Sequence, residues 1–480
     1  MGCRCDTVSG LIAGSVLGAL LAALGGILIP VGDNIIRSTV TKEAVIEPGT
    51  LAYENWIASG APVYRQFWLY DVQNAAGVVE NGETPRVSEK GPYTYRTRYL
   101  AKTNITAYEN HTVSFSLPAG AIFDPSMSVG PEEDVVTVLN LVVAGAYSTI
   151  PKFLHFLVEA EIKKSGASLF QNRTVKELLW GYFDPIRKDY VGVFYPYNDT
   201  ADGPYNIFTG KDDISKVSLI NSWRESSVLS FWKDPYCDMI NGTDASSFAP
   251  FLDKKKPLYF FSSDICRSVS AEYSGSHDLK GIEVYRYMLP AKTLASPRDN
   301  PDNMCFCHET LVTKNCTLAG VLDVRSCRDN APVYISLPHF LHGSPYLTQA
   351  VLGLSPSEEH HSTYLDVEPT TGFTLRFAKR LQVNMMYGPS LVITVLKKVK
   401  DYTIFPLAWL NETAALDDET ADRFKKDLVG RIDMLETVQI ALLSLGSAVC
   451  VLCAVAACVT EGEKQGKKMT SVHRMTLWNV

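Results

Sequence analysis

Two long apolar stretches near the ends of the chain constrain its fold more than any other feature. Residues 7–32 contain no Asp, Glu, Lys or Arg, and neither do residues 437–460. A hydrocarbon core roughly 30 Å thick needs about 20 apolar helical residues, and a soluble domain has no good place for such a stretch. The sequence therefore predicts two transmembrane helices. The first stretch could instead be a signal peptide, although it is longer than the ~7 to 15 apolar residues usual there.

Glycosylation sequons indicate which side of the membrane holds the middle of the chain. Lys and Arg residues flank each stretch about equally, so the positive-inside rule gives no orientation. Seven Asn-x-Ser/Thr sequons lie between the stretches, at Asn104, Asn110, Asn172, Asn198, Asn241, Asn315 and Asn411. Such acceptors are used outside the cytosol. The expected order is a cytoplasmic tail (1–6), a transmembrane helix (7–32), an extracellular or lumenal ectodomain (33–436), a second transmembrane helix (437–460) and a cytoplasmic tail (461–480).

Six cysteines cluster between the two stretches: Cys237, Cys266, Cys305, Cys307, Cys316 and Cys327. In an oxidising compartment this even number predicts three disulfides, and the residues alone leave 15 connectivities open. A zinc site formed by the Cys305–His308 run with Cys316 and His277 is an alternative. Paired Cys-x-x-Cys knuckles are missing, however, and the compartment would oxidise the thiols.

The remaining cysteines lie beside or within the apolar stretches. Cys3, Cys5 and Cys458 are predicted palmitoylation sites, since juxtamembrane thiols are typical acceptors. Cys450 and Cys453 are interpreted as small apolar residues of the second helix.

Small residues recur at every fourth position of the first stretch, at Gly10, Gly14, Gly18, Ala22 and Gly26. This stripe predicts a face that another helix can approach closely. The partner could be the second stretch of the same chain or a second molecule.

Between the stretches, alternating apolar and polar residues predict strands over 92–100, 281–288 and 373–381. Helical signals concentrate at 135–182, where Pro151 can occupy a first turn, Gly166 can end a helix, and Thr174 with Glu177 forms a capping box. An amphipathic segment over 417–431 leads toward the second stretch. The fold class is predicted to be α+β, with one β-rich ectodomain.

Composition and motifs exclude several functions. The net charge of −7 provides no positive field for nucleic acid. No nucleophile elbow, zinc-protease, Walker or dinucleotide motif is present, so we expect no catalytic residue, metal or cofactor. His339, His342, His360 and His361 are interpreted as structural or solvated histidines. The residues thus favour a receptor or carrier over an enzyme.

Five motifs are distributed along the chain between the apolar stretches: YRQFW at 64–68, GPYTYR at 91–96, ELLWGY at 177–182, NPDNMCFC at 300–307 and TGF at 371–373. Together they resemble the class B scavenger receptors. GAIF at 120–123, FSSDICRS at 261–268 and AKRLQVN at 378–384 resemble the branch known as fatty acid translocase and thrombospondin receptor. The resemblance covers nearly the whole chain.

The resemblance implies an ectodomain crossed by a lipid tunnel and topped by an apical helical bundle that meets ligands. It assigns ligand binding to Lys164 and Phe153, and disulfides to Cys237–Cys305, Cys266–Cys327 and Cys307–Cys316. Gly166 stands where the similar branch has another lysine, which would weaken binding of anionic ligands. Residues 151–190 carry seven basic against five acidic residues, so Lys152 and Lys163 join the predicted ligand-binding set.

The expected function is a plasma-membrane receptor for long-chain fatty acids, oxidised lipoprotein and membrane lipid, which passes lipid toward the bilayer without covalent chemistry. Alternatives are an adhesion receptor for a thrombospondin-type matrix protein, and a lysosomal trafficking receptor. The ending Trp478-Asn479-Val480 has a form that PDZ domains accept, so PDZ-type or kinase partners are possible at the tail.

Overall fold

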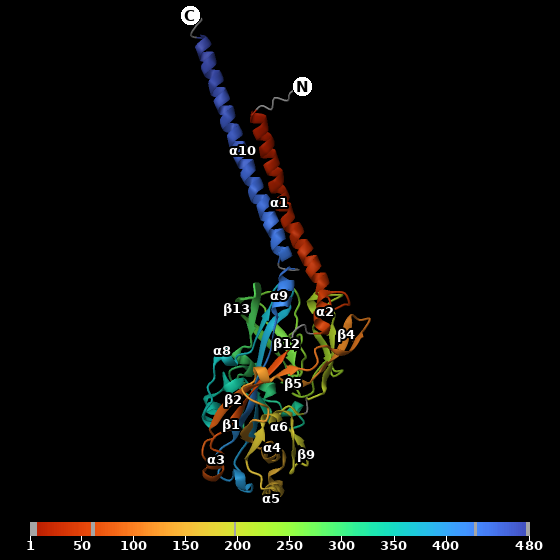
Figure 1. The fold of residues 1–480 in the computed structure, drawn as a ribbon, viewed down its shortest axis with the longest axis vertical. Helices are drawn as coiled ribbons and strands as arrows, with labels where there is room; N and C mark the ends of the chain where they lie inside the picture. The colour runs from red at the N-terminus through yellow and green to blue at the C-terminus, as the bar shows by residue number, and fades with distance from the viewer. Residues whose placement is uncertain (1–6, 59–62, 196–197, 427–429, 477–480) are drawn as a thin grey trace. The chain divides into compact units, whose positions relative to one another are not determined.

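The computed structural model describes residues 7–58, 63–195, 198–426 and 430–476. The chain forms two compact units, one made of Met1–Lys42 with Asp418–Val480 and the other of Glu43–Asp417 (Figure 1). We call the first the membrane unit and the second the ectodomain unit. The ectodomain unit is narrower than the predicted range 33–436.

The membrane unit consists of helices α1 (Thr7–Glu43), α9 (Asp418–Phe424) and α10 (Gly430–Thr476). Segments long and apolar enough to cross a membrane cover Thr7–Glu43 and Ile432–Lys467. Both helices are longer than the predicted spans, because polar residues beyond each apolar stretch continue the helix. The predicted amphipathic segment 417–431 contains α9, and residues 427–429 lie outside the described part of the chain.

Small residues bring the backbones of α1 and α10 together. A Cβ atom at Gly18 would overlap the backbone of Cys450, and one at Gly446 would overlap the backbone of Ala22. Ser15 Oγ donates to the carbonyl oxygen of Cys450 at 3.2 Å. The partner of the predicted stripe is therefore the second apolar helix of the same chain.

The stripe itself was predicted only partly correctly. A Cβ atom at Gly10 or Gly26 would have no neighbour within 4 Å, whereas one at Gly25 or Gly32 would overlap α10. Residues four apart in an α-helix advance by about 40° around the axis, so the five predicted positions drift away from the partner. Gly18, Gly25 and Gly32, spaced by seven, stay on the contact face.

The ectodomain unit is built on an antiparallel sheet of 11 strands in the order β12-β13-β14-β17-β18-β19-β1-β2-β5, with β16 paired to β18 and β15 to β16. Its strands are β1 (Tyr64–Val72), β2 (Val87–Thr97), β5 (Ala121–Phe123), β12 (Leu258–Ser262), β13 (Arg267–Leu279), β14 (Ile282–Met288), β15 (Leu322–Asp323), β16 (Val333–Ser336), β17 (Tyr364–Val367), β18 (Thr374–Tyr387) and β19 (Thr403–Ala415). The three predicted strands correspond to β2, β14 and β18, so this part of the α+β prediction is confirmed.

Three smaller sheets complete the β structure. They have the orders β11-β10-β4-β3, β6-β7 and β8-β9. Their strands are β3 (Thr103–Ala107), β4 (Thr112–Pro118), β6 (Val135–Leu139), β7 (Phe170–Thr174), β8 (Tyr182–Asp184), β9 (Asp189–Val191), β10 (Ala201–Phe208) and β11 (Ile220–Trp223).

Short helices connect and cover the strands. The α-helices are α2 (Leu51–Ile57), α3 (Ala75–Asn81), α4 (Leu141–Thr149), α5 (His155–Ser165), α6 (Val175–Trp180), α7 (Pro345–Ala350) and α8 (Glu358–His361). Turns of 3-10 helix are η1 (Pro125–Met127), η2 (Lys152–Leu154), η4 (Ile214–Lys216), η5 (Ala291–Leu294), η6 (Pro301–Phe306), η7 (Arg325–Cys327), η8 (Pro338–Phe340) and η9 (Thr394–Leu396).

The individual helix signals predicted within 135–182 are confirmed, but the segment is not helical over its whole length. Gly166 ends α5 with φ of 70°, and Thr174 and Glu177 form the capping box that opens α6. Residues 135–139 are instead β6, because their apolar run pairs with β7. Pro151 precedes the 3-10 turn η2, so α5 itself begins only at His155.

Three disulfides join the loops of the ectodomain unit: Cys237–Cys305, Cys266–Cys327 and Cys307–Cys316. This is the pairing that the resemblance implies. The sulfurs of the alternative zinc site are thereby consumed. His277, the histidine of that alternative site outside the Cys305–His308 run, lies on β13 opposite Val284 of β14. It is far along this strand from Arg267, the residue that directly follows the disulfide-bonded Cys266.

Candidate functional site

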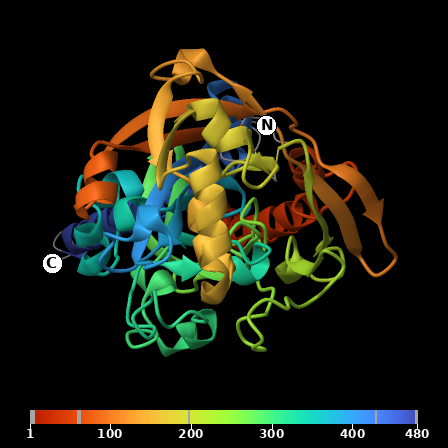
Figure 2. The same ribbon diagram turned by 90° about the horizontal axis from the view of Figure 1, so that it is seen from below.

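Helix α5 presents an apolar face to solvent, which is unusual for a helix of a folded domain. Its inner face is formed by His155, Val158, Glu159 and Ile162, all buried. On the opposite side, the relative exposures of Phe156 and Leu157 are 58% and 51%, and that of Phe153, in the turn η2 just before α5, is 77%. Helices α4 and α5 lie together at one end of the ectodomain unit (Figures 1 and 2). Exposed apolar groups of this size typically mark a binding surface.

Two lysines continue this outer face in the last turn of α5. Lys163 Nζ lies 3.0 Å from Glu159 Oε1, while Lys164 Nζ lies 3.8 Å from Glu161 and its side chain is 75% exposed. Lys164 lies seven residues after Leu157, so the two share a helix face. Of the two lysines, Lys164 is therefore the one more available to an external anion.

Glu159 connects α5 to a loop that is distant in sequence. Its carboxylate accepts hydrogen bonds from the backbone N and the Oγ1 of Thr394. Burial would raise the pKa of Glu159, but the bonds from Thr394 and the charge of Lys163 hold it below its ordinary value. Tyr147 of α4 donates to the carbonyl oxygen of Pro389 at 3.2 Å. The segment 389–394 is thus anchored to both α4 and α5.

This anchored segment also exposes apolar residues to solvent, which sequence reasoning missed. Leu391 is 92% exposed and Val392 is 45% exposed. Lys397, Lys398 and Lys400 follow and are exposed. Nothing in the local pattern of 389–400 relates it to α5, since the relation comes from tertiary contacts. We define the α5 surface as Lys152, Phe153, Phe156, Leu157, Lys163, Lys164, Leu391 and Val392.

The predicted ligand-binding residues all belong to the α5 surface, but they do not lie together at one point of it. Lys152 and Phe153 lie in η2 before α5 begins, and Lys163 and Lys164 lie in its last turn. At 1.5 Å per residue the two groups are about 15 Å apart. A ligand touching both must therefore be extended, or must present a surface.

His339, one of the histidines singled out in the sequence, is held by structural contacts. His339 Nδ1 accepts from the backbone N of Ser355, and His339 Nε2 lies 2.6 Å from Glu89 Oε2. Trp409 Nε1 donates to the same carboxylate oxygen at 2.7 Å. Burial would raise the pKa of Glu89, yet these bonds keep it below its ordinary value. His339 therefore has both ring nitrogens occupied, as expected for a structural role.

The predicted modification sites have different surroundings. Asn104, Asn110, Asn172, Asn241 and Asn315 are exposed, and Asn198 and Asn411 are half-buried. Cys458 is exposed on α10, while Cys450 and Cys453 are partly covered there. Cys3, Cys5 and the ending 478–480 lie outside the described residues. Glycosylation and palmitoylation stay predictions.

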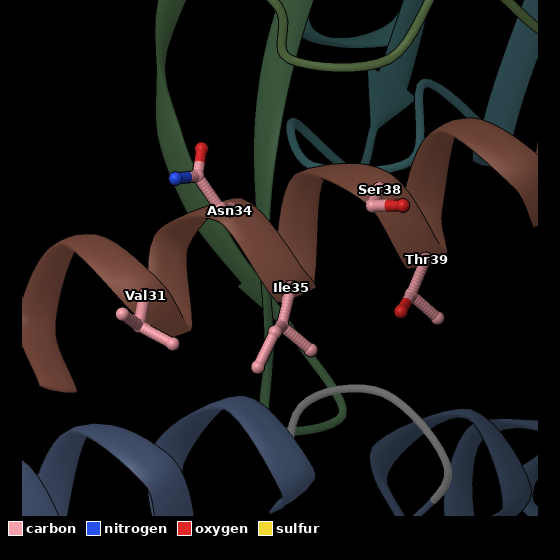
Figure 3. Close-up of a pocket in the computed structure, with 5 residues that line it drawn as sticks. All are labelled: Val31, Asn34, Ile35, Ser38 and Thr39. Carbon is pink, nitrogen blue, oxygen red and sulfur yellow. The ribbon is translucent and has the colours of Figure 1, made fainter.

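Two cavities formed by described residues bear on ligand binding, and neither of these two runs through the ectodomain unit. The larger, about 330 Å³, is an open groove along α1 lined by Val31, Asn34, Ile35, Ser38 and Thr39 (Figure 3). Val31, Ile35 and Thr39 point to one side of the helix. The second, about 30 Å³, lies beside the disulfides. The lipid tunnel stays a prediction.

Comparison with known proteins identifies the family. The family model described as CD36 family matches residues 16–457. The chain is 33% identical over 447 residues to "Scavenger receptor class B member 1" of Rattus norvegicus, covering 90% of this chain and 86% of the relative. It is 34% identical over 452 residues to the Sus scrofa protein of the same name, covering 91% and 86%.

A relative with a different name is similar to the same degree. "Lysosome membrane protein 2" of Homo sapiens is 35% identical over 436 residues, covering 86% of this chain and 87% of the relative. The two terminal apolar helices fit a two-pass membrane protein with both termini in the cytoplasm. Matched in this way over most of its length, the chain belongs to the CD36 family, the class B scavenger receptors.

Proposed function

We propose that this protein is a cell-surface receptor that captures long-chain fatty acids and the lipid of oxidised lipoprotein at the α5 surface. It passes them toward the bilayer without covalent chemistry. The observation that carries the proposal is the exposure of Phe153 in η2 and of Phe156 and Leu157 in α5, whose last turn carries Lys163 and Lys164.

The physical chemistry of the surface suits an anionic amphiphile. Burying one aromatic or aliphatic side chain against a ligand contributes about 1.5 to 3 kcal/mol, while an exposed lysine contributes roughly 0.2 to 1 kcal/mol toward an anion. Apolar contact would therefore supply most of the affinity. Lysines would supply selectivity and faster association. The pair Lys152 and Phe153 lies about 15 Å from the pair Lys163 and Lys164, and this separation favours contact with a lipid surface over contact with a single head group.

The test is binding of oxidised lipoprotein, at 4 °C, to cells that express the full chain, normalised to surface expression. We expect Phe153→Ala to weaken binding by about tenfold or more and Lys164→Ala by up to about fivefold. The matched control is Lys256→Ala, which removes an exposed lysine from another part of the ectodomain unit. Binding by all three variants equal to that of the wild type would exclude the α5 surface as the site.

A lysosomal trafficking receptor is the second candidate, favoured by similarity to a relative named for the lysosome membrane. Immunolocalisation of the full chain distinguishes it, since the first proposal requires most of the protein at the plasma membrane. The third, an adhesion receptor for a thrombospondin-type protein, would keep its partner affinity after delipidation.

For the membrane anchor, we propose palmitoylation at Cys458, Cys3 and Cys5, testable by acyl exchange.

A further inference from the structure

Arg267 is a buried cation without an anionic partner. The residue begins β13 directly after Cys266 and is 8% exposed. Among the described residues, no carboxylate oxygen lies within 4.0 Å of its guanidinium nitrogens. Placing an ionised group in a protein interior is costly unless a counter-charge or several strong hydrogen bonds compensate.

The hydrogen bonds of Arg267 are weak compensation. Nη1 donates to the carbonyl oxygen of Thr293 at 3.2 Å, Nη2 to Asn303 Oδ1 at 3.4 Å, and Nε to the carbonyl oxygen of Ser268 at 3.4 Å. All three acceptors are neutral, and all three bonds are longer than the roughly 2.9 Å that is usual for N–H···O. The guanidinium stacks 3.6 Å from the ring of Phe306. Burial lowers the pKa of Arg267 to about 10.

A small cavity adjoins this guanidinium. It measures about 30 Å³, and its lining includes Arg267, Asn303, Phe306 and the Cys307–Cys316 disulfide. A cavity of that volume has room for about one or two water molecules, or one ion of similar size. It is too small for a carboxylate ligand with an alkyl chain.

The two acidic residues that also line the cavity have partners of their own. Asp323 Oδ2 lies 2.8 Å from Arg325 Nε, and Asp323 Oδ1 accepts from the backbone N of Arg325. Glu309 accepts hydrogen bonds from the backbone N of Leu311 and of Val312. Among the described residues, neither carboxylate comes within 4.0 Å of the guanidinium nitrogens of Arg267, so neither forms an ion pair with it.

We propose that the cavity beside Arg267 is a binding site for a small monovalent anion of the halide class, which stabilises the disulfide-bonded part of the ectodomain. The ion completes the hydrogen bonding of the guanidinium and neutralises it. Chloride, which is abundant outside cells, is the expected occupant. The site lies away from the α5 surface in sequence and in its residues, so it stands independently of lipid capture.

The test measures thermal unfolding of the full chain in detergent, in sodium chloride or bromide against sodium gluconate at equal ionic strength. For the wild type we expect a saturable rise of about 2 to 4 °C with halide. Arg267→Gln should lose this rise and, in gluconate, should be at least as stable as the wild type, because no charge remains to be compensated. The control is Arg298→Gln, an exposed site where the halide effect should persist.

A second measurement does not depend on the folding of any variant. Crystals of the wild-type chain grown in sodium bromide should show an anomalous peak in this cavity. An absent peak, a water molecule at full occupancy, or a halide effect that survives Arg267→Gln would each overturn the proposal.

Discussion

The imidazole rings of His339 and His361 stack 4.4 Å apart with their planes inclined by 14°. His361 is buried, and its Nδ1 accepts from the backbone N of Ser357 at 3.0 Å. Trp409 packs edge-on against His361 at 5.4 Å. Two protonated rings at this separation would repel, so the packing suits a pair that carries one charge at most.

This pair predicts a loss of stability in acid. Burial, followed by the charges of His339, His360 and Arg380, lowers the pKa of His361 to about 4, with Glu89 opposing. Because the unfolded chain binds this proton near pH 6.5 and the folded chain does not, stability falls as the pH drops from about 6.5 to about 4. At about 1.36 kcal/mol per pH unit, His361 accounts for at most about 3.4 kcal/mol.

Urea denaturation of the full chain at several pH values between 7 and 4.5 checks this prediction. His361→Asn keeps an acceptor for the amide of Ser357 but cannot be protonated, so its stability should vary less with pH. Identical pH dependence in the two proteins would show that His361 does not control it.

The glycine contacts between α1 and α10 predict a specific cross-link. A Cβ atom at Gly14 would lie 2.8 Å from Cys453 Sγ, so Gly14→Cys should form a disulfide with Cys453 under mild oxidation. Adding Gly18→Leu should abolish it, because a side chain there overlaps the backbone of Cys450. Adding Gly26→Leu should leave it intact, since that position is open. Equal cross-linking in the two leucine variants, read on gels after proteolysis between the helices, would contradict this packing.

The three disulfides are expected to contribute unequally to stability. Cys266–Cys327 spans 61 residues and Cys307–Cys316 spans 9. In the chain-entropy description their removal costs about 4 and about 2.5 kcal/mol, respectively. Paired Cys→Ser variants and denaturant titration measure these costs. A larger cost for the short loop would mean that native contacts outweigh chain entropy there.

Substitution of Leu391 is expected to affect ligand binding without affecting the stability of the fold. With 92% of its surface exposed, it contributes little to folding, so Leu391→Asn should change the free energy of unfolding by less than about 0.5 kcal/mol. If the α5 surface captures lipid, the same variant should bind oxidised lipoprotein about tenfold more weakly. Leu396→Asn, at a fully buried position of the same loop, should instead destabilise the fold. Unchanged binding by Leu391→Asn would remove the loop from the surface.

Local sequence patterns correctly predicted the structural features that depend only on neighbouring residues. The capping box at Thr174 and Glu177 and the left-handed end of α5 at Gly166 form as expected, because neighbouring residues satisfy their backbone groups. The apolar run at 135–139 falls within the segment 135–182 in which helical signals concentrate, yet it is strand β6, because its partner β7 lies more than 30 residues away. Periodicity in a short apolar run does not distinguish the two.

The two membrane helices, the strand-rich ectodomain and the six bonded cysteines can be predicted without a structure, since apolar length, alternation and compartment act along the chain. The bond from Thr394 to Glu159 of α5, the stacking of His339 on His361 and the burial of Arg267 without a carboxylate are visible only in the folded chain. These relations depend on where distant strands and loops meet. Those contacts form because whole faces of strands and helices are buried against one another, and no local sequence pattern encodes which faces pair.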